Sequence, residues 1–373
     1  MIYLDYSATT PVDKKVLETF NKVCIDYPGN SNSLHKLGIE AKELENYATN
    51  KIEEILKLKN KEIIYTSGSS ESNNHIIKGL CFKYKKRGNH IITTNLEHSS
   101  IKSTLKYMEE NGFIIDYVKL KKDGTVDLED LEKLLNNKTI LVTICAVDSE
   151  LGIKQPIDEI KSILKKYPKC FFHSDCTQAI GKINVDFNSI DLASISLHKI
   201  YGLKGIGLII KNKNIVLSPL IHGGKSTTIY RSGTPPLPLI VSSMKAIELI
   251  IPNIDKNYEH VNNLNKIIID KLKTYKGIHI NSTNFSIPHI INISIDSIKP
   301  ETFVHALDEK DIYISTRSAC SISNTMSDSV YEVTNDKERA MHSLRISLSH
   351  LTTEEEVLTF LKVFEECYQK LKM

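Results

Sequence analysis

Short apolar runs alternate with helical patterns between about residue 35 and residue 210. Seven runs are rich in Ile and Val and mostly lack period-2 alternation: "KEIIYTS", "HIITT", "GFIIDYV", "TILVTIC", "KCFFHSD", "DLASIS" and "GIGLIIK". Such runs are typical of strands that are buried on both faces. Helical segments such as "GIEAKELENYATNKIEEILKLK" and "PIDEIKSILKKY" lie between the early runs. This order predicts a mainly parallel sheet covered by helices on both faces.

The last two runs flank the stretch "SISLHKIYGLKGIG", residues 194–207, and no helical pattern separates them. They predict a hairpin that adds one antiparallel strand to the sheet. The first of these strands ends in Ser196, His198 and Lys199, and three glycines follow. Taken alone, a lysine before a glycine-rich loop is consistent with a solvated turn or with a functional strand end.

The pattern changes after Pro238. A long helical region reaches about Lys276, and then come a strand "IPHIINISI", a helix "PETFVHALDEK" and a closing helix from Thr353. This third of the chain predicts a smaller α+β domain, with a boundary near residue 250. We therefore predict an α/β protein with a large domain over 13–250 and a small domain over 251–373, to which 1–12 also belong.

Composition and charge exclude several classes of function. Hydrophobic residues make up 41% and charged residues 25% of the 373 positions, as in an ordinary globular protein. The 48 Lys and Arg nearly balance the 45 Asp and Glu, so the net charge of +3 does not indicate a nucleic-acid partner. The basic run Lys83–His90 is consistent with the solvated end of a helix or with a patch that docks an acceptor protein.

Targeting and redox signals indicate the cytoplasm and no membrane. The stretch "MIYLDYSATTPVD" does not resemble a signal peptide, and no run approaches the roughly 18 apolar residues of a membrane span. Seven cysteines without a C-x-x-C pair favour a reducing compartment. The spacing in Cys170–Cys176, "CFFHSDC", is wrong for a zinc site, and we expect no metal.

Polar residues gather where the predicted strands end, which is where open α/β sheets bind ligands. Gly68, Ser69 and Ser70 precede a helix, a pattern typical of an anion site or of a simple helix cap. Three further strands end in candidate groups: His98; Asp175 and Gln178; Ser196, His198 and Lys199. Pyridoxal phosphate needs a lysine for a Schiff base, a carboxylate at its pyridine nitrogen, a flat group over its ring and donors for its phosphate. Together the four strand ends predict a site for this cofactor.

With these residues in place, the sequence resembles the cysteine desulfurases, pyridoxal-phosphate enzymes with the type I fold of the class V aminotransferases. The motifs span nearly the whole chain: "YLDYSATTPV", "TSGSSESNN", "EHSS", "ELGIKQPI", "HSDCTQAIGK", "SLHKIYGLKGIG", "RSGT" at 231–234, "SAC" at 318–320 and "LRISLSHLTTEEE". The "SAC" motif followed 25 residues later by Arg345 points to the desulfurase branch.

The resemblance implies a role for each site residue. Lys199 forms the Schiff base, Asp175 pairs with the pyridine nitrogen, and His98 stacks over the ring. Gln178 and Ser149 contact the phenolic oxygen, and Arg345 binds the substrate carboxylate. The phosphate ligands are Ser69, Ser70, Ser196 and His198, with Thr234 reaching the phosphate of a second subunit. The resemblance therefore also implies a homodimer, L-cysteine as substrate, and a sulfur acceptor that is an iron–sulfur scaffold or a tRNA-thiolation enzyme.

Cys320 is implied as the nucleophile that receives sulfur as a persulfide. It stands in the Ser-rich segment "STRSACSISNTMSDS", which has no apolar periodicity and predicts a loop. A nearby cation lowers a thiol's pKa, and Arg317 is close in sequence. We expect the other cysteines to be small core residues: Cys24, Cys81, Cys145, Cys170, Cys176 and Cys367.

Three positions depart from the family pattern. Asp148 and Ser149 replace an Asn-Asn pair, Lys225 to Thr228 replace a Gly- and Gln-rich loop, and Arg317 replaces a glycine before "SAC". Two alternatives therefore stay open. One is another pyridoxal-phosphate reaction, such as that of an aminotransferase or a lyase. The other is a weakened homologue that serves as a binding partner in sulfur transfer.

Overall fold

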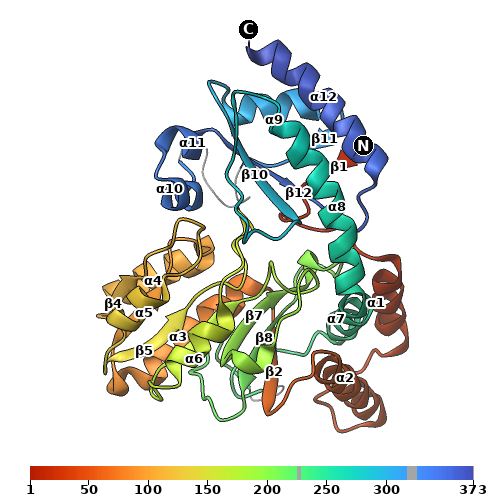
Figure 1. Ribbon diagram of the computed structural model, residues 1–373. Helices are drawn as coiled ribbons and strands as arrows, with labels where there is room; N and C mark the ends of the chain where they lie inside the picture. Colours follow the sequence, from red (N-terminus) through yellow and green to blue (C-terminus); the bar gives the residue numbers. More distant parts are fainter. Residues whose placement is uncertain (225–227, 317–325, 373) are drawn as a thin grey trace.

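The computed structural model describes residues 1–224, 228–316 and 326–372 (Figure 1). The helices are α1 (Lys14–Asp26), α2 (Lys36–Ile55), α3 (Ser69–Tyr84), α4 (Ser99–Glu110), α5 (Leu128–Leu134), α6 (Ile157–Leu164), α7 (Leu237–Ile250), α8 (Ile254–Leu272), α9 (Pro300–Asp308), α10 (Asp328–Thr334), α11 (Lys337–Met341) and α12 (Glu354–Lys372). The strands are β1 (Ile2–Tyr3), β2 (Lys61–Thr66), β3 (His90–Thr93), β4 (Ile114–Tyr117), β5 (Thr139–Thr143), β6 (Phe171–Asp175), β7 (Leu192–Ser196), β8 (Gly207–Asn212), β9 (Ile278–Ile280), β10 (Ile290–Ile295), β11 (Ile312–Tyr313) and β12 (Ser343–Ser347).

Within the described ranges, the largest sheet has seven strands in the order β2-β8-β7-β6-β5-β3-β4. Strands β4, β3, β5, β6 and β7 pair in parallel, whereas β8 is antiparallel to both β7 and β2. The mainly parallel α/β sheet, and the hairpin that gives it one antiparallel strand, are confirmed. The carboxyl ends of β5, β6 and β7 consequently lie side by side at one edge of the sheet.

Both faces of this sheet are buried, which explains why its strands lack polar–apolar alternation. On β2, Ile63 and Tyr65 belong to an apolar cluster with α2, α5, α6 and α7. The residue between them, Ile64, belongs to a cluster on the opposite face with α3 and α4. Leu208 and Ile210 of β8 alternate with Ile209 in the same way. Because successive side chains of a strand point to opposite faces, each face receives apolar residues.

A second, smaller unit follows in the chain. Its antiparallel sheet has the order β12-β10-β9, and residues of α8, α9 and α12 share its apolar cluster. Strand β1 joins this unit by pairing in parallel with β11, where Ile2 lies opposite Ile312 and Tyr3 opposite Tyr313. The predicted strand at 287–295 and the helices at 300–310 and after Thr353 are present. The two-residue strands β1 and β11 were not predicted.

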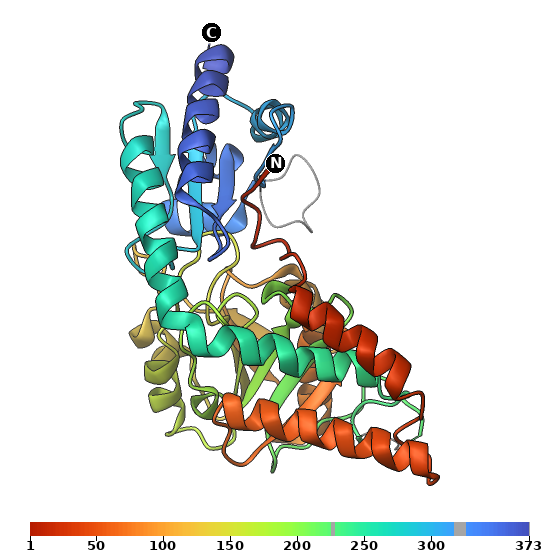
Figure 2. The same cartoon turned by 90° about the vertical axis from the view of Figure 1, so that its right-hand side faces the viewer.

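Helices α7 and α8 form one long bent connection between the two sheets (Figure 2). The bend lies at the 3₁₀ turn Ile251–Asn253, where Pro252 lacks the N–H that would continue the α-helical hydrogen bonds. By length and composition, Leu237–Leu272 qualifies as a membrane span, contrary to the expectation from the sequence. However, 56% of its most apolar window is buried inside the protein, as in the core helix of a soluble domain.

The expectation that the cysteines other than Cys320 are core residues is wrong for Cys24. Its side chain is exposed, because the buried face of α1 is formed by Val16 and Val23. The remaining five are buried. One of these, Cys145, follows β5 and lines the cavity described below.

Candidate active site

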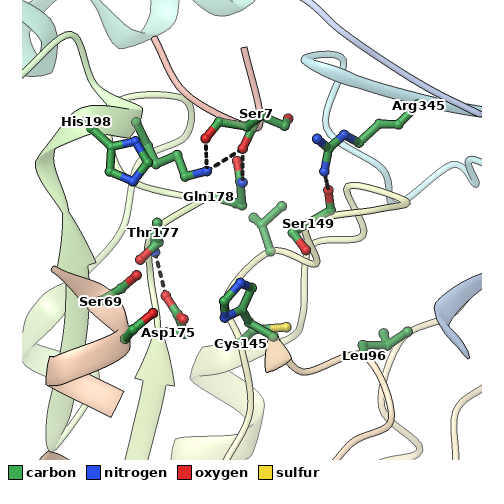
Figure 3. A pocket seen from close by; sticks show the side chains of 15 residues that line it. Ser7, Ser69, Leu96, Cys145, Ser149, Asp175, Thr177, Gln178, His198 and Arg345 are labelled. Carbon is green, nitrogen blue, oxygen red and sulfur yellow. Dashed lines mark hydrogen bonds between the residues drawn. The ribbon is translucent and has the colours of Figure 1, made fainter. Parts of the chain in front are cut away.

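A cavity of about 190 Å³ lies at the carboxyl edge of the large sheet (Figure 3). Its lining comes from the N-terminal segment, the ends of β5, β6 and β7, the N-termini of α3 and α4, and strand β12 of the small unit. The predicted residues that it brings together are Ser69, Ser70, His98, Ser149, Asp175, Gln178, His198, Lys199 and Arg345. Ser69 and Arg345, which are 276 positions apart in the sequence, thus line the same cavity.

Lys199 ends the 3₁₀ turn Leu197–Lys199 that follows β7. Its Nζ donates to the carbonyl oxygens of Ser7 and Ala8, at 2.6 Å each. The glycines after it have two uses. Gly205 has φ = 86°, which allows the turn into β8, and a Cβ on Gly207 would lie 2.6 Å from Gly68 Cα. The lysine and glycines therefore form a packed strand end at the cavity, and the solvated-turn interpretation is wrong.

Asp175 is held as a carboxylate acceptor at the end of β6. Asn73 Nδ2 donates to its Oδ2 at 2.8 Å, and the Thr177 backbone N–H donates to its Oδ1 at 3.0 Å. Asp175 is only 6% exposed, so these two hydrogen bonds fix its orientation in the cavity wall. Asn73 belongs to the "TSGSSESNN" motif, but no pattern in that motif assigns it this role.

Two histidines line the cavity in the neutral form. Burial lowers the pKa of His98, whose Nδ1 accepts the Ser100 N–H at 3.2 Å as the cap of α4. Burial, with Lys199 adding to it, lowers the pKa of His198 to about 4. His198 Nδ1 lies 3.0 Å from Thr9 Oγ1. A neutral imidazole at either position can accept or donate a proton at its free nitrogen.

The N-terminus of α3 faces the cavity without a side-chain cap. Its N-cap is Gly68, with φ = 154°, which has no side chain to cap the first turn. Ser69 and Ser70 of this turn line the cavity beside Thr177. The hydroxyl oxygen of Thr177 is buried and has no hydrogen-bond partner among the described residues. Free donors at a helix N-terminus, beside an unused hydroxyl, suit an anion.

Arg345 reaches the cavity from β12 and is 1% exposed. Its Nη2 pairs with Asp5 Oδ1, and its Nη1 donates to the Ser149 carbonyl, both at 2.9 Å. Within the described part of the chain its Nε has no partner. A buried guanidinium with an unused donor at a cavity wall suits a carboxylate ligand.

The Asp148–Ser149 pair, which departs from the family pattern, lies in the turn that carries the Ser149 carbonyl, the acceptor for Arg345. Asp148 is fully buried and accepts the backbone N–H groups of Glu150 and Leu151. Burial raises the pKa of Asp148 to about 6. Ser329 of α10 also donates to it, at 3.3 Å. Asp148 therefore acts as a turn residue, while Ser149 lines the cavity.

Two predicted site residues that the structure describes, Ser196 and Thr234, do not line the cavity. Ser196 is 3% exposed, and its Oγ would lie 3.5 Å from a Cβ on Gly68, just behind the α3 N-terminus. Thr234 is exposed at the start of the segment before α7. Cys320 lies outside the described residues, as do Arg317 and Lys225 to Thr227.

Six lining residues were not predicted: Ser7, Ala8, Leu96, Cys145, Val147 and Thr177. Ser7 and Ala8 belong to the quoted "YLDYSATTPV" motif, which was the available signal. Cys145 ends an apolar run and gave none. Next to it, Glu97 is buried and accepts the Cys145 backbone N–H at 2.9 Å, and burial raises the pKa of Glu97 to about 8.

Comparisons with known proteins agree with this geometry. The family model "Aminotransferase class-V" matches residues 2–360. The chain belongs to the class V aminotransferase family. It is 38% identical to the cysteine desulfurase IscS of Buchnera aphidicola subsp. Schizaphis graminum, covering 100% of this chain and 93% of that one. It is 37% identical to a mitochondrial cysteine desulfurase of Eremothecium gossypii, covering 100% of this chain and 76% of the relative.

A solved structure of a NifS-like protein superposes with a TM-score of 0.93 at 35% identity, covering 99% of this chain and 100% of that one. The type I fold and the resemblance inferred from the motifs are thereby confirmed. Enzymes of this family use pyridoxal phosphate.

The cavity fits this cofactor by observations that are independent of the family. The uncapped α3 N-terminus and the unused Thr177 hydroxyl suit its phosphate. Asp175 offers a fixed carboxylate for the pyridine nitrogen, and Lys199 offers an amine on the same cavity. We propose these residues, with His98, Gln178, His198 and Ser149, as the cofactor contacts.

Proposed function

We propose that this protein is a cysteine desulfurase, which removes sulfur from L-cysteine and leaves L-alanine. The observation that supports this most directly is the cavity shared by Lys199 and Arg345. It offers a lysine amine and a buried guanidinium in one cavity, and an amino acid needs both an amine-reactive site and a carboxylate clamp. The relatives named cysteine desulfurase support the same reaction.

In the proposed reaction, Arg345 orients the substrate through its carboxylate, and the Lys199 amine, with the neutral His98 nearby, moves protons at the substrate carbons. Pyridoxal phosphate, when bound, supplies the electron sink that accepts the pair left by a broken substrate bond. The Cys320 thiolate bonds to the substrate sulfur as the carbon–sulfur bond breaks. The carbon takes up a proton to give alanine, and the sulfur stays on Cys320 as a persulfide.

The Cys320→Ser variant tests this proposal. It should bind the cofactor and L-cysteine normally but form almost no alanine, because only sulfur abstraction needs the thiol. The wild-type protein should form alanine and sulfide in equal amounts with a reductant, and should gain one sulfur on the Cys320 peptide without it. Cys24→Ser, which changes an exposed cysteine of α1, is the matched control and should keep full activity.

Three results would argue against a desulfurase. Alanine formation by Cys320→Ser at the wild-type rate would exclude the mechanism through this residue. Keto-acid formation from other amino acids would favour an aminotransferase, and a protein without bound cofactor or turnover would favour a non-catalytic partner.

The proposal extends to the assembly, the location and the domains. We propose a cytoplasmic homodimer in which the exposed Thr234 contacts the phosphate of the second subunit. Its sulfur acceptor is an iron–sulfur scaffold or a tRNA-thiolation enzyme, which labelled persulfide transfer would distinguish. The division at residue 250 is supported by the bend at Ile251–Asn253 and by the separate apolar clusters on either side.

A further inference from the structure

Lys182 is a buried lysine for which the proposed reaction has no use. It is 7% exposed, and in the described part of the chain it forms no ion pair with a carboxylate. Its Nζ instead donates to the side-chain oxygen Oε1 of Gln178, four residues earlier. Burying an amine without a counter-ion is costly, so its retention beside the cavity needs an explanation.

This contact determines how the Gln178 amide is turned. On one side, Lys182 Nζ presents N–H donors, so it faces the amide oxygen. On the other side, the Ser7 carbonyl can only accept, and it lies 3.0 Å from Gln178 Nε2. An amide nitrogen has two hydrogens, and Ser7 uses one. The second N–H is therefore available on the cavity side of Gln178, which lines the cavity with Lys199.

The other charged and titratable groups around Lys182 come from several elements. Lys199, on the turn after β7, and Arg345 of β12 add to burial in lowering the pKa of Lys182 to about 7. His289 precedes β10, and burial lowers its pKa well below the usual value, while His198 is also neutral at pH 7. A charged and a neutral amine both keep N–H donors, so the hydrogen bond to Gln178 persists through this titration.

We propose that Lys182 is a positioning residue for Gln178. By donating to Oε1, it keeps the second Nε2 hydrogen of Gln178 directed at the cofactor oxygen next to the carbon that Lys199 binds. This inference rests on the proposed function, because it takes Lys199 and Gln178 as cofactor contacts.

The test measures the pH at which the visible absorbance of the bound cofactor changes. A donor to an oxygen anion stabilises the deprotonated form, so losing the donor should move the midpoint to higher pH. Lys182→Met should raise it by about one pH unit, the effect of losing one charge-assisted hydrogen bond. Lys182→Gln, which is similar in shape to the Met variant but retains an N–H donor, should stay near the wild type.

A double-mutant cycle separates positioning from a general effect. Gln178→Ala should raise the midpoint as Lys182→Met does, and the double variant should equal Gln178→Ala alone, because Lys182 acts through Gln178. Lys211→Met is the control, since Lys211 is also buried but pairs with Glu62 and lies opposite Leu192, at the end of β7 away from the cavity. The pH midpoint of the Lys211→Met variant should equal that of the wild type.

The inference is overturned by any of three results. The Lys182→Met midpoint is unchanged, the Lys182→Gln midpoint rises as much as that of Lys182→Met, or the shifts of Lys182→Met and Gln178→Ala add in the double variant. Thermal unfolding is measured for every variant, and Lys182→Leu replaces Lys182→Met if the latter does not fold. Borohydride reduction and peptide mapping of the wild type test the underlying assignment separately. Cofactor on a lysine other than Lys199 would contradict the proposed site, whereas cofactor on Lys199 with no shift would contradict only the role of Lys182.

Discussion

Two parts of the cavity, which we call its floor and its rim, are built in different ways. The floor consists of residues at the ends of neighbouring strands of one sheet: Asp175, which ends β6, and His198 and Lys199, which follow β7. The rim joins three distant segments, since Arg345 of β12 contacts Asp5 near the N-terminus and the Ser149 carbonyl after β5. The floor is thus fixed by the pairing of strands, and the rim by the packing of the small unit. Changes in the floor should affect cofactor binding, and changes in the rim should affect substrate binding.

The largest effect should follow from Lys199→Ala, in the floor. The variant should lose all covalent, borohydride-reducible cofactor, because no other described lysine lines the cavity. Absorbance spectra and peptide mapping measure this. Reducible cofactor on a different lysine in this variant would refute the assignment.

Arg345→Ala, in the rim, should leave cofactor binding intact and weaken the binding of the substrate. Losing a charge-assisted pair to a carboxylate costs about 2–4 kcal/mol, which raises the KM for L-cysteine by roughly 30- to 1,000-fold. Asp5→Asn should raise KM less, because it removes only a partner that orients the guanidinium. Steady-state kinetics measure the KM of each variant. An unchanged KM for Arg345→Ala would mean that a residue other than Arg345 binds the substrate carboxylate.

The smallest effect concerns acid, which should lower the stability of the protein through one histidine of the large sheet and one of the turn after β7. Burial lowers the pKa of His198, and of His173 on β6, to about 4, whereas an unfolded histidine has a pKa of about 6.5. Between these values the unfolded chain binds more protons, so the stability is fully present above about pH 6.5 and falls as the pH drops towards 4. Urea unfolding at a series of pH values measures this. His198→Asn should have a shallower decline, and identical slopes would contradict the prediction.

The sequence predicted the floor better than the rim for a physical reason. Strands buried on both faces, such as β2 and β7, have apolar runs that show in the sequence, and the residues that follow them share a sheet edge. Asp175, Gln178 and Lys199 could therefore be placed together. The salt bridge of Asp5 with Arg345 joins residues 340 positions apart, and no local pattern indicates such a contact. Strands β1 and β11 have two residues each, too few for a periodicity.

Family motifs identified some of the residues that no local pattern indicates. Arg345 was found through its resemblance to a family position, whereas the acceptor roles of Ser7 and Ala8 were not. Those two residues act through backbone carbonyls, and a carbonyl is present at every position whatever the side chain. Cys24 was misplaced because helical periodicity gives the buried face of a helix only to within a neighbouring residue.

The pairing of β1 with β11 has a consequence for the order in which the protein is made. Residues 2–8 are translated more than 300 residues before their partners Ile312–Tyr313, Arg345 and Ser347. At typical rates of about 5–20 residues per second, this interval lasts on the order of tens of seconds. During it, the large sheet can form and contact Ser7 through Gln178 and Lys199, while the partners of β1 and of Asp5 are still missing. The Arg345 side of the cavity is therefore completed only after the small unit has emerged.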